Sequence, residues 1–244
     1  MLTYNDVLDE LQDYILDDKR IHKSSEMKLT HIKQETIKPV KRDIQKPSLF
    51  TPSQQDGLFW CFYIIKNGDA NYETLNNKTT LVAKQQKIEH VSLIRQNKDV
   101  VKLYKLDTIT NLENNLANDM NLNIKTFLTL CAIENINIIY VNNKTYYELL
   151  TNDTDVIYVV HELQNQSKYH KKYGYELGTE ETINKIRNSL YKLEIVDKPI
   201  KGISAYKVSD LLEICSKLEI ETVNKTSDKK KSKNELYESI IQYF

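Results

Sequence analysis

One uninterrupted apolar run, LFWCFYII at residues 58–65, constrains the fold of this chain more than any other feature. The run has no polar side, so it must be buried on all sides at the centre of a core. Ser53 and Asp56 are helix-start residues that precede it, and Asn67-Gly68 is a typical helix stop. We therefore predict a fully buried helix here. The run is much shorter than the ~20 residues of a membrane span, so no such span is expected.

A second apolar pattern, from residue 123 to 162, predicts the sheet. NIKTFLTLCAIENI carries apolar residues at helical spacing, and the short strand-like runs INIIYV, TYYELL and VIYVVHE follow it, separated by polar turns. An antiparallel meander is the simplest arrangement of these runs. Residues 80–106, 111–120 and 180–193 add surface helices. We therefore predict an α+β domain over residues 49–200, with helices packed on a small, mostly antiparallel sheet.

The first 48 residues differ from the rest in their charge. Residues 1–18 carry six acidic and no basic side chains, with apolar residues at helical spacing. Residues 19–47 carry nine basic and three acidic side chains. We predict an amphipathic acidic helix over 1–18 and a basic linker over 19–48, which either contacts nucleic acid or an acidic partner, or is a solvated tether. Because the whole chain has zero formal charge, a globally basic nucleic-acid coat protein is excluded.

The last segment, residues 201–244, predicts two helices joined by a lysine-rich loop. Val208, Leu211 and Cys215 form an apolar face on the first helix, and the second begins near Ser232. Lysines before a helix N-terminus suit phosphate groups, since the ammonium charges and the helix start both attract anions. Such contact with nucleic acid would be salt-dependent and tolerant of sequence. The candidate nucleic-acid-binding residues are Lys207, Lys225, Lys229, Lys230, Lys231 and Lys233.

This C-terminal segment resembles a SAP motif, a two-helix module that usually binds double-stranded nucleic acid. The resemblance is carried by the apolar spacing of the first helix, by Ile220 at the loop entry and by KNEL at 233–236. The chain has Glu219 and Lys231 where the family usually has Gly, and its inter-helix loop is longer than usual. The resemblance implies DNA as a partner. The alternatives for this segment are a protein-docking module and a simple packing unit.

The order of residues in the central domain also allows an enzymatic hypothesis. Cys61 lies one turn into the predicted buried helix, where a helix start lowers a thiol pKa, and His161 or His170 could act as the base. A helix-borne Cys followed by a sheet with a histidine at its end resembles papain-like cysteine peptidases of the ovarian-tumour type. Aligning the Asp-Gly-Leu-Phe sequence with that family places Gly57 at the nucleophile, which would make the chain an inactive relative. The other interpretation is that Cys61 is a core residue.

Signatures of cofactor and metal sites are missing from the sequence. We find no P-loop, no GxGxxG, no HExxH and no CxxC pair. The five histidines show no metal-ligand spacing, so we expect neither a metal nor a cofactor. Three scattered cysteines and an N-terminus without a secretory signal favour a reducing compartment.

Four segments carry a wider resemblance, to an uncharacterised protein family of large nucleocytoplasmic DNA viruses. They are GLFWCFYIIKNG, INIIYVNNKTYYELL, KYHKKYGYEL and DKPIKGISAYKVSDLLEIC. The resemblance implies a virus factory in the host cytoplasm, or the virion, as the setting, with viral or virion proteins as partners and no secretion. It brings no known activity with it.

Together these patterns predict a non-enzymatic viral protein. We expect it to contact DNA through its C-terminal module, residues 201–244, and to recruit a partner through its central domain. The alternatives are a papain-like cysteine peptidase or its inactive relative, and a minor structural protein of the virion.

Overall fold

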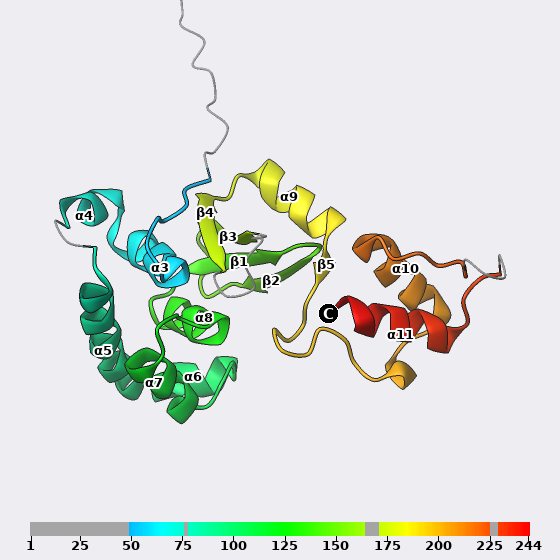
Figure 1. Ribbon diagram of the computed structural model, residues 1–244, viewed down its shortest axis with the longest axis horizontal. Helices are drawn as coiled ribbons and strands as arrows, with labels where there is room; N and C mark the ends of the chain where they lie inside the picture. The colour runs from blue at the N-terminus through cyan, green and yellow to red at the C-terminus, as the bar shows by residue number, and fades with distance from the viewer. Residues whose placement is uncertain (1–48, 76–77, 164–170, 225–228) are drawn as a thin grey trace, which may run out of the picture. The chain divides into compact units, whose positions relative to one another are not determined.

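The structure is a computed structural model that describes residues 49–75, 78–163, 171–224 and 229–244 (Figure 1). Nine α-helices and a five-stranded sheet make up this described part, which confirms the predicted α+β fold. The acidic helix and the basic linker predicted for the first 48 residues lie outside the described residues. None of the described helices has the length and apolarity that crossing a bilayer requires.

Helix α3 (Gly57–Asn67) is the buried helix that the apolar run predicts. The side chain of Asp56 caps its start by accepting a hydrogen bond from the backbone N–H of Phe59 at 3.2 Å. Gly68, with a φ of +84°, ends it, in a backbone region that glycine enters at little cost. Leu58 through Phe62 have at most 1% of their surface exposed, so the helix is the centre of the main core.

Helices α4 and α8 pack directly against α3, and α5, α6 and α7 pack against α8 to complete the main core (Figure 1). Residues 80–106, where one or two surface helices are predicted, form two, α5 and α6, separated at Asn97. Helix α8 is as buried as α3, because seven of its ten residues are buried, against seven of eleven in α3. The bounds of these helices are α4 (Asp69–Thr74), α5 (Thr80–Gln96), α6 (Lys98–Tyr104), α7 (Ile109–Asn118) and α8 (Ile124–Ile133).

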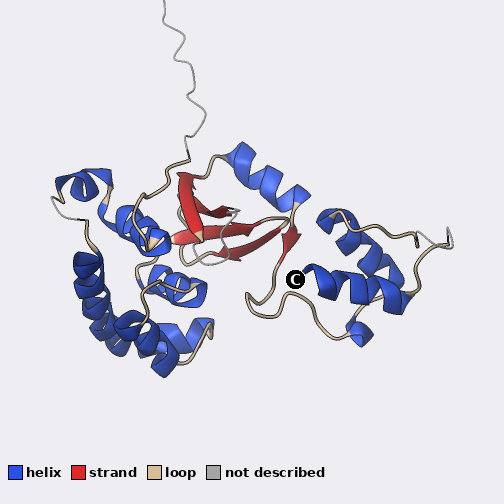
Figure 2. Cartoon of the chain, viewed as in Figure 1, coloured by secondary structure: helices blue, strands red, loops and turns tan. Residues whose placement is uncertain are grey.

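The sheet is mixed, with the strand order β4-β3-β1-β2-β5 (Figure 2). Two of its pairings are antiparallel, β1 with β2 and β3 with β4, and two are parallel, β1 with β3 and β2 with β5. The strands are β1 (Asn137–Asn142), β2 (Thr145–Leu149), β3 (Ile157–Leu163), β4 (Lys172–Leu177) and β5 (Tyr191–Lys192).

The predicted meander is wrong in one pairing, because β3 lies parallel to β1 instead of antiparallel to β2. Five successive residues of β1 are buried, which is typical of a central strand that has a neighbour on each side. The buried side chain of Asn137, at the start of β1, explains the return of the chain to this strand. Its amide accepts from the backbone N–H groups of Thr151 and Asn152 and donates to the carbonyl of Thr154.

The two faces of the sheet belong to different cores. Ile138 and Val160 pack in the main core with α3, whereas Ile139 and Val159 pack against helix α9 (Glu180–Ser189) in a second, smaller core. This alternation follows from the two-residue period of a strand. Helix α9 is shorter than the helix predicted over 180–193, because it ends at Ser189 and β5 follows it.

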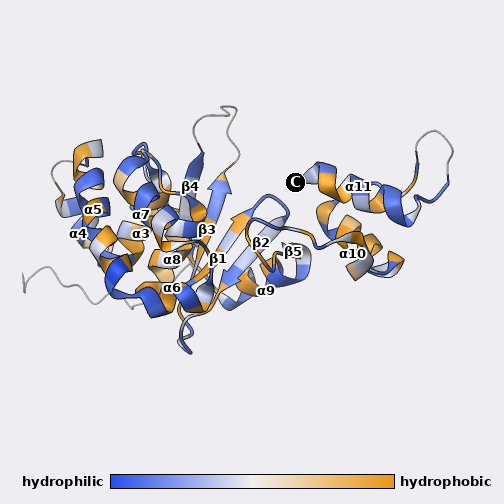
Figure 3. Ribbon diagram, turned by 90° about the horizontal axis from the view of Figure 1, so that it is seen from below, coloured by the Kyte–Doolittle hydropathy of each residue, from blue (hydrophilic) through white to orange (hydrophobic). Residues whose placement is uncertain are grey.

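Two helices, α10 (Val208–Leu218) and α11 (Lys233–Tyr243), form the C-terminal segment, after a short 3₁₀ turn at Ile203–Ala205. Both carry hydrophobic and hydrophilic residues along their length (Figure 3). Their buried side chains form a third apolar cluster, separate from the other two. Its members are Leu211, Ile214, Cys215, Leu218, Leu236 and Ile240.

Candidate functional site

Cys61, the nucleophile of the enzymatic hypothesis, is a core residue. It has 0% of its surface exposed and lies among the apolar side chains of the main core. Burial, with a smaller effect from the charge of Asp56, raises the pKa of the Cys61 thiol far above its ordinary value. A thiol that stays protonated and has no access to solvent cannot attack a substrate.

His161 does not meet Cys61, because the sheet separates them. Along β3, Val160 faces the main core, so its neighbours Val159 and His161 face the other side. The ring Nε2 of His161 lies 3.0 Å from a carboxylate oxygen of Glu176 on β4. The hypothesis of a Cys61–His161 pair is therefore wrong, and His170 lies outside the described residues.

Gly57, the alternative position for a nucleophile, is the first residue of α3. A Cβ atom placed on Gly57 would lie 3.5 Å from the backbone N of Tyr173 on β4, so a tyrosine stands beside this position. Neither alignment thus brings a nucleophile and a histidine together among the described residues. A catalytically inactive relative of the peptidase fold stays a prediction.

A polar cleft of about 550 Å³ lies beside Gly57, and the sequence did not reveal it. It is centred on Glu162, whose carboxylate accepts hydrogen bonds from the hydroxyls of Tyr140 and Tyr173 and pairs with Lys171 Nζ at 2.7 Å. Burial and this carboxylate raise the pKa of both tyrosines. Three donors therefore contact this carboxylate, of which the Tyr173 hydroxyl, at 3.5 Å, is the most distant. The cluster depends on the parallel pairing of β1 with β3, which the sequence pattern did not predict.

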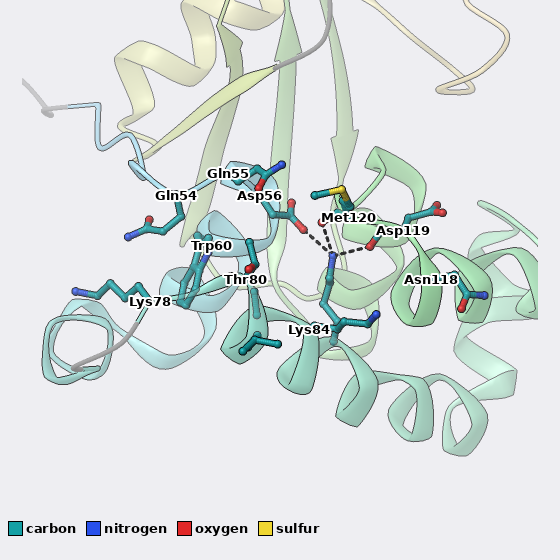
Figure 4. A pocket seen from close by; sticks show the side chains of 13 residues that line it. Gln54, Gln55, Asp56, Trp60, Lys78, Thr80, Lys84, Asn118, Asp119 and Met120 are labelled. Atoms are coloured by element: carbon teal, nitrogen blue, oxygen red, sulfur yellow. Dashed lines mark hydrogen bonds and ion pairs between the residues drawn. The ribbon is translucent and has the colours of Figure 1, made fainter.

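A buried ion pair between Asp56 and Lys87 joins three parts of the main domain (Figure 4). Nζ of Lys87, on α5, donates to Asp56 Oδ2 at 2.9 Å and to the backbone carbonyls of Asp119 and Met120 at 3.1 and 2.9 Å. Asp56 also accepts from the backbone N–H of Leu122 at about 3 Å, besides capping α3. All three ammonium donors are used, so both buried charges are compensated.

A pocket of about 250 Å³ opens beside this ion pair (Figure 4). Buried Trp60 and Ala83 form part of its apolar wall. Leu81 and Met120 also line it, although 77% and 68% of their surfaces are exposed. No sequence signal indicated this pocket, because its residues come from three separate segments, 54–60, 78–87 and 118–120.

The lysine-rich loop of the C-terminal segment is partly ordered by backbone pairing. Val223 and Lys230 form an antiparallel bridge, flanked by bonds from Asn224 N–H to the Lys229 carbonyl and from Lys231 N–H to the Thr222 carbonyl, both 2.9 Å. The side chains of Lys229 and Lys230 are exposed, and Nζ of Lys231 bonds the hydroxyl of Ser239 at 2.9 Å. The structure therefore leaves Lys229 and Lys230 accessible and draws Lys231 onto α11.

The starts of α10 and α11 carry the other candidate lysines. The carboxylate of Asp210 accepts from the backbone N–H of Lys207 at 2.8 Å, and this bond lowers the Asp210 pKa. The charges of Lys207 and Lys233 lower it further, so Lys233 acts on a residue of the other helix. Lys207 directly precedes α10, and Lys233 is the first residue of α11. Lys225 lies outside the described residues.

The helix start expected to bind phosphate is already capped by the chain itself. Ser232 Oγ accepts from the backbone N–H of Glu235 at 3.4 Å, and the Glu235 carboxylate accepts from the backbone N–H of Ser232 at 2.7 Å. This capping box satisfies two of the amide groups that a phosphate would use. The lysine side chains, rather than the α11 amides, are therefore the main positive groups here.

Residues 201–244 contain eight Lys and seven Asp or Glu, so the module has a formal net charge of only +1. Most of its lysines lie in the inter-helix loop and at the starts of the two helices, whereas Lys217 lies in the last turn of α10 and pairs with Glu213. Contact with a polyanion would therefore be local.

Comparison with known proteins identifies no relative, since no family model, curated protein or solved structure matches the chain. Within the part of the chain that the structure describes, no group of three or more His, Cys, Asp or Glu side chains could hold a metal ion.

Proposed function

We propose that this chain is a non-enzymatic, DNA-associated protein that contacts phosphate groups through its C-terminal lysines and recruits a protein partner through its central domain. The observation that supports DNA contact best is the exposure of Lys229 and Lys230 in the loop that joins α10 and α11, with Lys207 and Lys233 at the starts of these two helices. The SAP resemblance of the same segment agrees with it.

The physical basis is the release of counterions from DNA. Each lysine that neutralises a phosphate lowers the slope of log affinity against log salt by about 0.9. Contacts by Lys229, Lys230 and Lys233 therefore correspond to a slope near −2.7 in total. Because contacts to phosphate groups carry no direct sequence information, this binding is tolerant of sequence.

The test is a fluorescence-anisotropy titration of a labelled DNA duplex with the full chain at several salt concentrations. The variant Lys229→Gln/Lys230→Gln/Lys233→Gln should bind more weakly and lose most of the salt slope. Lys231 is kept, because it bonds Ser239. A matched control replaces three exposed lysines of the central domain, Lys98, Lys102 and Lys105, with Gln.

The control should keep both the affinity and the slope of the unaltered chain. If the C-terminal variant also keeps them, DNA contact by this module is excluded. If the unaltered chain does not bind DNA even at low salt, the SAP resemblance concerns architecture alone.

The setting of this function rests on the wider sequence resemblance. An origin in a large DNA virus, with the virus factory or the virion as location, is part of the proposal. Quantitative mass spectrometry of purified particles tests it, and stoichiometric copies would instead favour the structural role in the virion.

A further inference from the structure

The pocket beside the Asp56–Lys87 pair has the size of one large side chain. Its volume is about 250 Å³, and an apolar cavity of about 150 Å³ is enough to hold benzene. Pockets for drug-sized ligands are larger, at about 300–1,000 Å³. Trp60 and Ala83 offer an apolar wall for such a side chain.

The wall of this pocket is held in place by the buried ion pair. Lys87 ties the cap of α3 to the backbone carbonyls of Asp119 and Met120, and both charged side chains are almost fully buried. Breaking any of these contacts would leave a buried charge without a partner, which is costly. The pocket is therefore preformed, and filling it needs little rearrangement.

The apolar rim favours a protein over a small molecule. Leu81 and Met120 line the pocket, yet most of their surface is exposed. A small molecule that filled only the pocket would leave these two side chains in water. A protein segment that inserted one side chain and crossed the mouth would cover them, as the rim of a binding hot spot is covered.

The charges at the pocket favour an acidic segment. Lys78 and Lys84 both line it, and Lys84 has no acidic partner within 4 Å among the described residues. Nζ of Lys78 lies 4.2 Å from the centre of the Tyr72 ring. Of the lining acids, Asp56 is neutralised by Lys87, whereas Asp119 keeps its charge although it accepts a bond from the amide of Asn115. Two accessible lysines against one accessible carboxylate leave the pocket with a net positive charge.

From this geometry we infer that the pocket is the docking site for an acidic protein segment that inserts one large apolar side chain between Trp60 and Ala83. Lys78 and Lys84 contact the carboxylates of this segment, and Leu81 and Met120 pack against its backbone. This inference rests on the proposed recruitment of a partner by the central domain, and it names the surface and the chemistry of that partner.

The single tryptophan of the chain makes the inference testable with the full-length protein. Trp60 lines the pocket, so its fluorescence reports on an inserted side chain. The probe is a synthetic heptapeptide, a Phe flanked on each side by three Glu, with blocked ends. Two control peptides replace the Phe with Ala, or the six Glu with Lys.

The acidic Phe peptide should change the Trp60 emission saturably below about 1 mM, which corresponds to roughly 4 kcal/mol of binding. The variant Lys78→Glu/Lys84→Glu should weaken binding at least tenfold. The matched reversal of two exposed lysines on α6, Lys98→Glu/Lys102→Glu, should leave it unchanged.

Several results would overturn the inference: no saturable change up to about 1 mM, equal binding of the Ala peptide, or equal binding of the Lys peptide. Phenylacetate binding as tightly as the acidic peptide would assign the pocket to a small molecule instead. Failure of DNA contact is separable, because the Lys229→Gln/Lys230→Gln/Lys233→Gln variant should still bind the peptide, and the Lys78→Glu/Lys84→Glu variant should still bind DNA.

Discussion

Helices α3 and α11 both begin at a polar capping residue, but the cap of α3 is buried and the cap of α11 is exposed to solvent. At α3 the capping Asp56 is sealed inside the domain with Lys87, and every ammonium donor has an acceptor. At α11 the cap is Ser232 with Glu235, both exposed, and the nearby Lys229 and Lys230 extend into solvent. A lysine whose donors are all satisfied inside the fold supports the structure, whereas an exposed one can meet a partner.

The largest expected effect comes from removing the buried ammonium group of Lys87. Lys87→Met should lower the free energy of unfolding by about 3–5 kcal/mol, because Asp56 is left as an uncompensated buried charge. Urea denaturation followed by circular dichroism measures the change.

The matched control is Lys84→Met, one turn earlier on α5 and exposed, which should change the free energy of unfolding by less than about 0.5 kcal/mol. Adding Asp56→Asn to Lys87→Met should recover part of the loss, because the amide still caps α3 without carrying a charge. Equal losses for Lys87→Met and Lys84→Met would mean that the ion pair contributes no more than a surface lysine.

The three cysteines of the chain, all buried and unpaired, allow the main core and the C-terminal cluster to be compared directly. The cluster around Cys215 has six buried apolar residues, against twenty-three in the main core with Cys61 and Cys131. The smaller core should open at a lower free energy. Cys215 should therefore be alkylated by iodoacetamide roughly tenfold faster, which corresponds to about 1.4 kcal/mol.

Peptide mapping after timed alkylation at pH 8 measures the three rates. Burial raises the pKa of all three thiols, but the nearby charge of Lys231 offsets part of this rise at Cys215. This effect also favours faster alkylation of Cys215. Equal rates would show that the helix pair and the main domain open as one unit. Faster reaction at Cys61 would revive its candidacy as a nucleophile.

The smallest expected effect concerns the exposed cap. Ser232→Ala removes the hydroxyl that accepts from the N–H of Glu235 and should cost about 1 kcal/mol of α11 stability. The alkylation rate of Cys215, which faces α11, should rise about fivefold. Ser216→Ala, an exposed substitution within α10, is the control. An unchanged rate for Ser232→Ala would show that Glu235 caps the helix without it.

The sequence predicts features that depend on neighbouring residues and misses those that depend on distant ones. The apolar run at 58–65 leads directly to α3, because a helix without a polar side has to be buried. The pairing of β3 with β1 needs the side chain of Asn137, a single buried amide with no pattern around it. Lys87 gives no signal either, since a lysine on a polar helix normally faces solvent. The docking pocket depends on the second of these, because the contacts of Lys87 hold together the segments that line it.

The strand order has a consequence for how the chain folds. β1 pairs with β2 on one side and with β3 on the other. We expect the local β1–β2 hairpin to form first, because its contacts are close in sequence, and to provide the template for the later pairing of β3. That later step closes the 150–156 connection, and the bonds of Asn137 with Asn152 and Thr154 form only when it is closed. Asn137 should therefore act mainly on the unfolding rate, so Asn137→Ala is expected to shorten the lifetime of the native state and to change the folding rate little.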